Sequence, residues 1–131
     1  MKMDRERYTD LIDLADKAIE AELKPKEHLY QVDSQYKGHV AAFGVSVLMS
    51  GIKPTFAYFN DSKDKIKTTV LVLLGHMIKD DQPECFVNYP TAEELYDTVV
   101  EMTPEEEDEF RKRILEYAVA LKHVIRTYKL V

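Results

Sequence analysis

The chain has 131 residues and a formal net charge of -6, and at this length one hydrophobic core suffices, so we predict a single domain over residues 1–131. Its one cysteine, Cys85, excludes an intrachain disulfide and is more typical of a small buried hydrophobe than of a reactive thiol. No apolar run approaches the roughly 18 residues of a membrane helix, and the acidic, amphipathic start lacks the apolar core of a signal peptide, so we expect a cytoplasmic protein without membrane contact.

Charge is distributed unevenly along the chain. Residues 79–109 hold twelve acidic residues and one lysine, whereas residues 110–131 hold six basic residues and one acid, Glu116. An anionic partner meets one face of a protein and not its average charge, so this asymmetry keeps nucleic acid among the possible partners.

Helical periodicity begins near the start of the chain. An apolar stripe on one side predicts a helix from Met3 to Leu23, and Pro25 then ends it. A second helix is predicted over residues 34–50, where apolar residues cover almost every side. Such a helix is either central in its domain or covered by a partner. From Tyr36 to Phe59 only Lys37 and Lys53 are formally charged.

The remaining elements are also predicted to be helical. Gly51 is a plausible left-handed stop, Pro54 fits the first turn of a short helix over 54–59, and Ser62 can cap a fourth helix that continues to about residue 79. Residues 80–90 favour a loop. Capping boxes then open a fifth helix at Thr91 and a last helix at Thr103, which we expect to run almost to the C-terminus. Because clean two-residue alternation is absent, we predict an all-α fold, a compact bundle of five to six helices.

The last helix carries the main basic feature. At about 100° per residue, its cations fall within roughly 60° of one another beside the apolar stripe. A solvated face is the simpler explanation of such a row, but other helix faces are acidic and this row contains no carboxylate. The row consists of Arg111, Lys122, Arg126 and Lys129. A second group, Lys63, Lys65 and Lys67, is explained well enough by solubility.

Signals for catalysis are weak. The four histidines are scattered singly, and although His76 and Asp80 could share a helix face, two groups do not make a metal site. Phosphate loops and zinc-binding motifs are absent from the sequence, so we expect no metal, no cofactor and no enzymatic activity. Most tyrosines and phenylalanines fit the core, while Tyr58 and Phe59 stay open as stacking surfaces for bases.

Two segments carry a resemblance to a known family. Tyr36, Lys37 and Gly38 open a helix, Phe43-Gly44 follows, and the helix ends in Ser50–Lys53 and Thr55–Tyr58. This order resembles the small helical subunit of the Cmr effector complex, the type III-B CRISPR RNA-guided particle. There a tyrosine opens the helix, Leu-Pro follows, and motifs like Asn-Gly-Leu-Gly and Ala-Leu-Ala-Phe close it.

The last helix resembles the same family. Ala118–Leu121 are in register with its Ala-Leu-Ala-Leu, and Arg126 stands on its first basic position. The sequence departs from the family pattern where Lys53 replaces a glycine, Val124 a tryptophan and Thr127 the second basic residue. The two segments cover about a third of the chain.

The resemblance implies a non-catalytic subunit. It implies copies of the chain aligned along a guide RNA–target RNA duplex, touching one another and the backbone subunits, with sequence read by base pairing and not by protein. The acids of residues 84–109 would then face away from RNA or meet a basic partner. The candidate RNA-binding residues are Lys37, Lys53, Arg111, Lys122, Arg126 and Lys129.

One alternative is a helical protein–protein adaptor that contacts no nucleic acid. The two hypotheses differ in a geometric expectation, because RNA binding requires the six candidate cations to converge on one surface.

Overall fold

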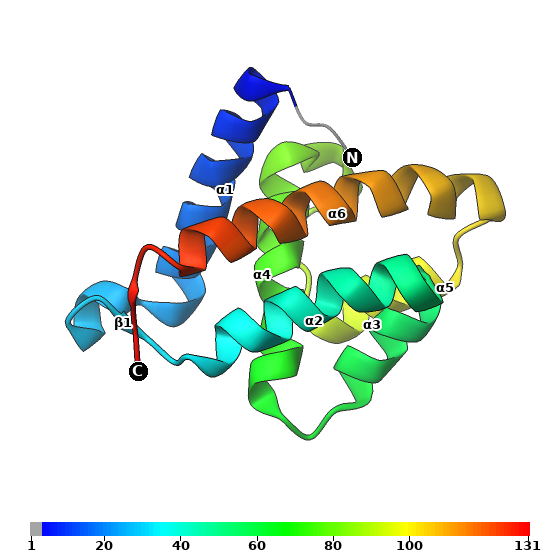
Figure 1. The fold of residues 1–131 in the computed structure, drawn as a ribbon. Coiled ribbons are helices and arrows are strands. Elements are labelled where there is room, and N and C mark those ends of the chain that lie inside the picture. The colour runs from blue at the N-terminus through cyan, green and yellow to red at the C-terminus, as the bar shows by residue number, and fades with distance from the viewer. Residues whose placement is uncertain (1–3) are drawn as a thin grey trace.

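The structure, a computed structural model, describes residues 4–131, and its secondary structure is almost entirely helical (Figure 1). This confirms the predicted all-α bundle; the predicted start at Met3 lies outside the described residues. In chain order the elements are α1 Arg5–Leu23, the 3-10 turn η1 Pro25–His28, β1 Gln31–Val32, α2 Gln35–Ser50, α3 Ile52–Asp61, α4 Lys65–Asp81, the 3-10 turn η2 Pro83–Cys85, α5 Ala92–Val100, α6 Pro104–Ile125 and β2 Lys129–Leu130.

Side-chain caps fix where most helices begin. The capping boxes predicted at Thr91 and Thr103 are both present, each with a reciprocal glutamate three residues on. The predicted cap of α4 at Ser62 is wrong, because the Asp64 carboxylate accepts from the backbone N–H of Ile66 at 2.9 Å. Ser62 instead ends α3, and its hydroxyl accepts from the backbone N–H of Asp64.

Gly51 alone separates α2 from α3. Its φ of 92° lies in the region that favours glycine, but its ψ of 176° is extended, so the predicted left-handed helix stop is wrong. The extended ψ lets α3 begin at once at Ile52, two residues before the predicted Pro54, and the two helices fold back on each other.

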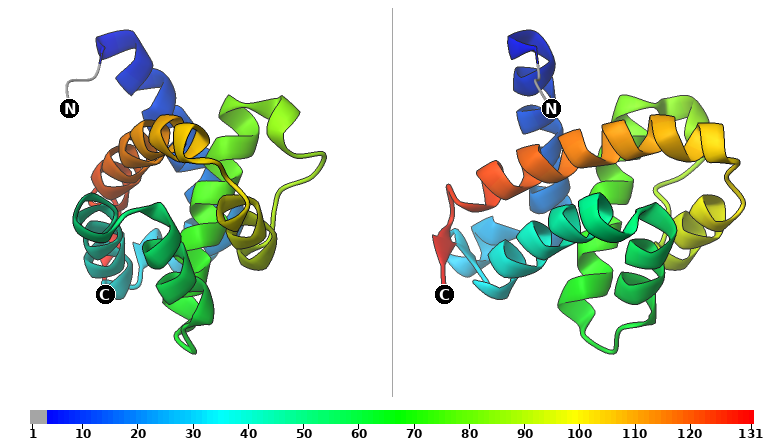
Figure 2. Two further views of the ribbon diagram at one scale, coloured as in Figure 1. Left: turned by 90° about the vertical axis from the view of Figure 1, so that its right-hand side faces the viewer. Right: turned by 45° about the vertical axis from the view of Figure 1, so that its right-hand side comes forward.

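The bundle is arranged around α4. Helices α2 and α6 run side by side in opposite directions, while α4 crosses them and α1 packs against both α4 and α6 (Figures 1 and 2). Fully buried Phe43 makes edge-to-face contacts with Phe56 and Phe59, at centroid distances of 5.4 and 5.2 Å. The six α-helices of residues 4–131 thus share one hydrophobic core.

The end of the chain differs from the prediction. Helix α6 ends at Ile125, and β2 pairs in parallel with β1, an interaction between distant segments that local periodicity does not reveal. The backbone N–H of Ser34 also donates to the carbonyl of Val131 at 2.8 Å, which ties the start of α2 to the chain end. Cys85 is exposed, so the expectation of a buried hydrophobe was wrong.

A polar cluster joins α1, α4 and α6. The Arg7 guanidinium donates to both Asp81 carboxylate oxygens at 2.7 and 2.8 Å, and the Tyr117 hydroxyl donates to the same carboxylate at 2.6 Å. The hydrogen bond from Arg7 lowers the pKa of Asp81, while burial and then Asp81 raise the pKa of Tyr117. This charged cluster fixes α1 against the other two helices.

Candidate nucleic-acid interface

A shallow groove of about 190 Å³ runs between α2 and α6. Its floor is made of small and apolar side chains, because Ala41 and Gly44 on α2 face Ala118 and Val119 on α6. Lys122 lies on its wall. The remaining lining residues are Val40, Val45, Leu48 and Leu115. The groove therefore has an uncharged floor with at least one cation at its edge.

Three predicted cations follow α6 along this groove. Arg111, Lys122 and Arg126 are separated by eleven and four residues, spacings that bring side chains to one helix face. Glu116, the one acid of this segment, is turned toward α1, where its carboxylate lies 3.7 Å from Arg7. The row on α6 is therefore free of negative charge between Arg111 and Arg126.

Lys37 joins the row from α2. It precedes Ala41 and Gly44 by four and seven residues, so it shares the groove-facing side of α2. Because α2 and α6 are antiparallel and Ser34 is bonded to Val131, Lys37 lies near the C-terminal half of α6. Within residues 4–131, none of Lys37, Arg111, Lys122 and Arg126 forms an ion pair.

Two candidates lie apart from this row. The Lys53 ammonium pairs with Glu107 at 3.0 Å and donates to the carbonyl of Met102 at 3.1 Å, which ties α3 to the start of α6. Lys129 belongs to β2 and not to α6, so its predicted place on the helical row was wrong. It is exposed beside the end of α6. Lys112, which the prediction omitted, is also exposed and lies 14 residues, close to four helical turns, before Arg126.

The outward side of α2 is uncovered. Val45, Leu48 and Met49 are 55%, 59% and 82% exposed, and α2 carries no acidic side chain. The prediction left two explanations for an all-apolar helix, a central position or cover by a partner. The structure places α2 at the surface, which favours the partner. These three residues are called the α2 apolar face below; Val45 and Leu48 also line the groove, so this face is continuous with the basic row.

The two aromatic residues left open behave differently. Phe59 is 2% exposed and belongs to the core, whereas Tyr58 is 60% exposed. The Lys67 ammonium lies 4.6 Å from the Tyr58 ring centroid and donates to its hydroxyl at 2.9 Å. One ring face of Tyr58 is thus already occupied by a cation.

Three of the four histidines contact a partner side chain, His39 with Asp64, His76 with Glu22 and His123 with Tyr8. His76 does not face Asp80 but meets Glu22 at 2.7 Å and stacks on Tyr89. The Asp80 carboxylate instead accepts from the Tyr89 hydroxyl. Within residues 4–131, no three His, Cys, Asp or Glu side chains are placed to hold a metal ion. In the same range, no helix has the length and apolar character that a membrane crossing requires.

The fold defines a small all-α protein with an uncovered apolar face beside a row of cations. The family model described as CRISPR-associated protein (Cas_Cmr5) matches residues 12–128, and the chain belongs to this family, whose members are subunits of the type III-B Cmr effector complex. Comparisons with curated proteins and with solved structures gave no significant match.

Proposed function

We propose that the protein is a non-catalytic scaffold subunit that contacts the guide RNA–target RNA duplex through the face formed by α2 and α6. The observation that carries the proposal is Lys122 in the wall of a groove with an uncharged floor. Helical spacing brings Arg111 and Arg126 to the same side as Lys122 and puts Lys37 on the groove-facing side of α2. Cations that have no protein partner can bind the phosphates of an RNA of any sequence. The protein would therefore supply contacts that do not depend on sequence, and base pairing between guide and target would select the duplex. Lys53, which pairs with Glu107, and Lys129, which belongs to β2, lie apart from this row, and the proposal does not depend on them.

The α2 apolar face supports a protein contact beside the RNA. Large apolar side chains gathered on one helix mark a site of association, and copies of the same chain or the backbone subunits of the complex would cover them. A pure adaptor without RNA contact explains this face but not the adjoining row of unpaired cations. We therefore favour a subunit that binds both RNA and protein.

Reversing the charge of Lys122 and Arg126 together should weaken RNA binding. With both changed to glutamate, the assembled complex should bind cognate and scrambled single strands less tightly. The slope of log affinity against log salt should fall by about 0.7 per lost phosphate contact. Binding is measured by fluorescence anisotropy of labelled RNA across a salt series.

The matched control reverses two exposed cations on α1, Arg5→Glu with Lys17→Glu, which changes net charge equally away from the groove. This control should keep the wild-type slope. If the Lys122/Arg126 variant enters the complex and keeps both affinity and slope, the α2–α6 face does not touch RNA, and the adaptor hypothesis replaces the proposal.

The α2 apolar face can be tested without changing charge. Val45→Gln with Met49→Gln should lower the fraction of the subunit that copurifies with the complex by at least about tenfold, because two apolar side chains lose their buried partner surface. The control, Leu29→Gln with Val100→Gln, changes two exposed apolar residues elsewhere and should copurify normally. Equal recovery of both variants would remove this face from the interface.

A further inference from the structure

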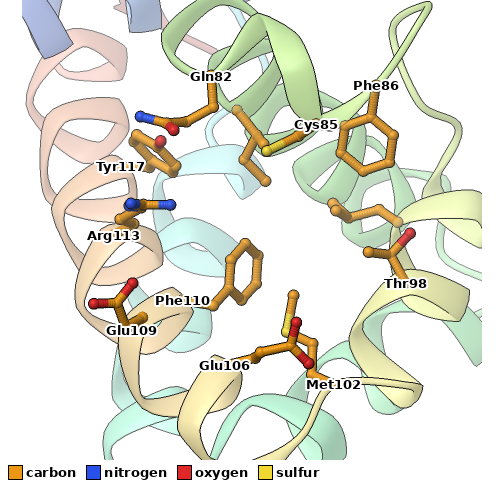
Figure 3. Close-up of a pocket in the computed structure, with 12 residues that line it drawn as sticks. Gln82, Cys85, Phe86, Thr98, Met102, Glu106, Glu109, Phe110, Arg113 and Tyr117 are labelled. Atoms are coloured by element: carbon orange, nitrogen blue, oxygen red, sulfur yellow. The ribbon is translucent and has the colours of Figure 1, made fainter.

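A second cavity, of about 330 Å³, lies between α4, α5 and α6, away from the α2–α6 groove (Figure 3). Phe86, Leu95, Met102 and Phe110 give it an apolar interior. Thr98 lines it from α5, and the ring of Phe110 points into it from α6 (Figure 3). A cavity of this size is at the lower end of known ligand pockets and can hold one or two apolar side chains.

The surroundings of this cavity are acidic. Glu106 and Glu109 lie in its wall against one cation, Arg113. Glu84 adjoins the wall residue Cys85. Of the twelve carboxylates in residues 79–109, only Asp81 and Glu107 lie within 4 Å of a cationic nitrogen of the described chain. The wall therefore holds more carboxylates than cations, and within residues 4–131 Glu84, Glu106 and Glu109 form no ion pair.

The pKa of the wall residue Cys85 responds to the charges near it. Burial raises the pKa of the Cys85 thiol, Glu84 raises it further, and Arg113 opposes them. Because Glu106 and Glu109 outnumber Arg113 in the wall, the cavity does not favour a small anionic ligand. A positively charged partner would instead be attracted by the carboxylates of Glu106 and Glu109.

We infer that the α4–α5–α6 cavity is a docking site for a basic segment of another protein, which inserts one apolar side chain between Phe86 and Phe110 while its cations face the surrounding carboxylates. Apolar area in the cavity supplies affinity, and charge complementarity selects the partner and steers its approach. This inference rests on one part of the proposed function, namely that the protein binds other proteins. It does not depend on RNA binding.

The probe is a fluorescein-labelled peptide of lysine and alanine with one central leucine, titrated with the full-length protein and followed by anisotropy. We expect saturable binding that weakens at least about tenfold when the leucine is replaced by alanine. A peptide with glutamate in place of lysine should not bind. Equal binding of the leucine and alanine peptides would show attraction to acidic surface alone and overturn the inference.

Filling the cavity provides the structural test. Thr98→Trp should place an indole in the cavity and lower affinity for the leucine peptide at least about tenfold. Because the natural chain has no tryptophan, a blue-shifted emission verifies that the indole is buried. Thr9→Trp is a matched control, since Thr9 and Thr98 are both exposed helical threonines whose hydroxyls donate to the carbonyl four residues before. Unchanged affinity in a Thr98→Trp variant whose indole is buried would overturn the inference, whatever the outcome of the RNA experiments.

Discussion

Replacing Asp81 with alanine is expected to lower the free energy of unfolding by about 3 kcal/mol. The change leaves the Arg7 guanidinium without its bidentate partner and the buried Tyr117 hydroxyl without an acceptor. The Asp81 side chain is only 11% exposed, whereas Arg7 is 29% exposed and can recover some water, which limits the loss. Urea denaturation followed by circular dichroism measures it.

Asp80→Ala is the matched control. Asp80 is the adjacent residue, and within residues 4–131 its carboxylate accepts only from the exposed Tyr89 hydroxyl, so its loss should cost less than about 1 kcal/mol. If both alanine variants unfold at the same urea concentration, the Arg7–Asp81–Tyr117 cluster contributes little to stability and the role assigned to it is wrong.

The same cluster predicts a pH dependence. Because the folded-state pKa of Asp81 is lowered, its stabilising effect is fully present above the unfolded-state pKa, about 3.9, and is lost as pH falls through the folded value. Asp81→Asn lacks the titrating charge. The stability difference between wild type and Asp81→Asn should therefore be constant above about pH 5 and should shrink on acidification below about pH 4.

Local sequence signals predicted the helices well. Capping boxes at Thr91 and Thr103 act within four residues, so their outcome does not depend on the rest of the fold. Ser62 and Asp64 are both good caps only two residues apart, and local rules do not choose between them. The predicted end of α6 was wrong for a different reason. The helix ends at Ile125, and the residues that follow form β2, which pairs with β1 about a hundred residues earlier in the chain.

The candidate site could be predicted only in part. Helical spacing relates Arg111 and Lys122 within α6 and extends to Arg126, the C-cap residue that directly follows the helix, so this part of the prediction needs only local structure. The partner of Lys53 could not be foreseen, since Glu107 reaches it only through packing of α3 against the α5–α6 junction. The α4–α5–α6 cavity was also missed, because its walls come from separate segments and residues 80–90 were expected to be a simple loop.

The loop that closes this cavity makes a close contact with α4 at Gly75. A Cβ atom there would lie 2.9 Å from Cγ and 3.5 Å from the carbonyl oxygen of the buried Pro90. Real Cβ atoms do not approach other atoms so closely, so any larger side chain must displace the loop. The same loop carries Phe86 into the cavity wall and stacks Tyr89 on His76 at 4.1 Å.

Gly75→Val is therefore expected to cost about 3 kcal/mol, the upper part of the range for overpacked cores, although valine has a better helix propensity than glycine. Gly38→Ala is the control, because no atom lies within 4 Å of a Cβ at that helical position, and it should be neutral or stabilising by up to about 1 kcal/mol. Both values come from urea denaturation.

A double-mutant cycle identifies the cause. Pro90→Ala removes the ring atom nearest to the new side chain, so the combined Gly75→Val and Pro90→Ala variant should be more stable than the sum of the single changes predicts, by about 1 kcal/mol or more. Strict additivity would mean that the loop is not held against α4 at this point. In that case Phe86 would also lose its fixed place in the cavity wall, since the loop that positions it packs on α4 through Pro90.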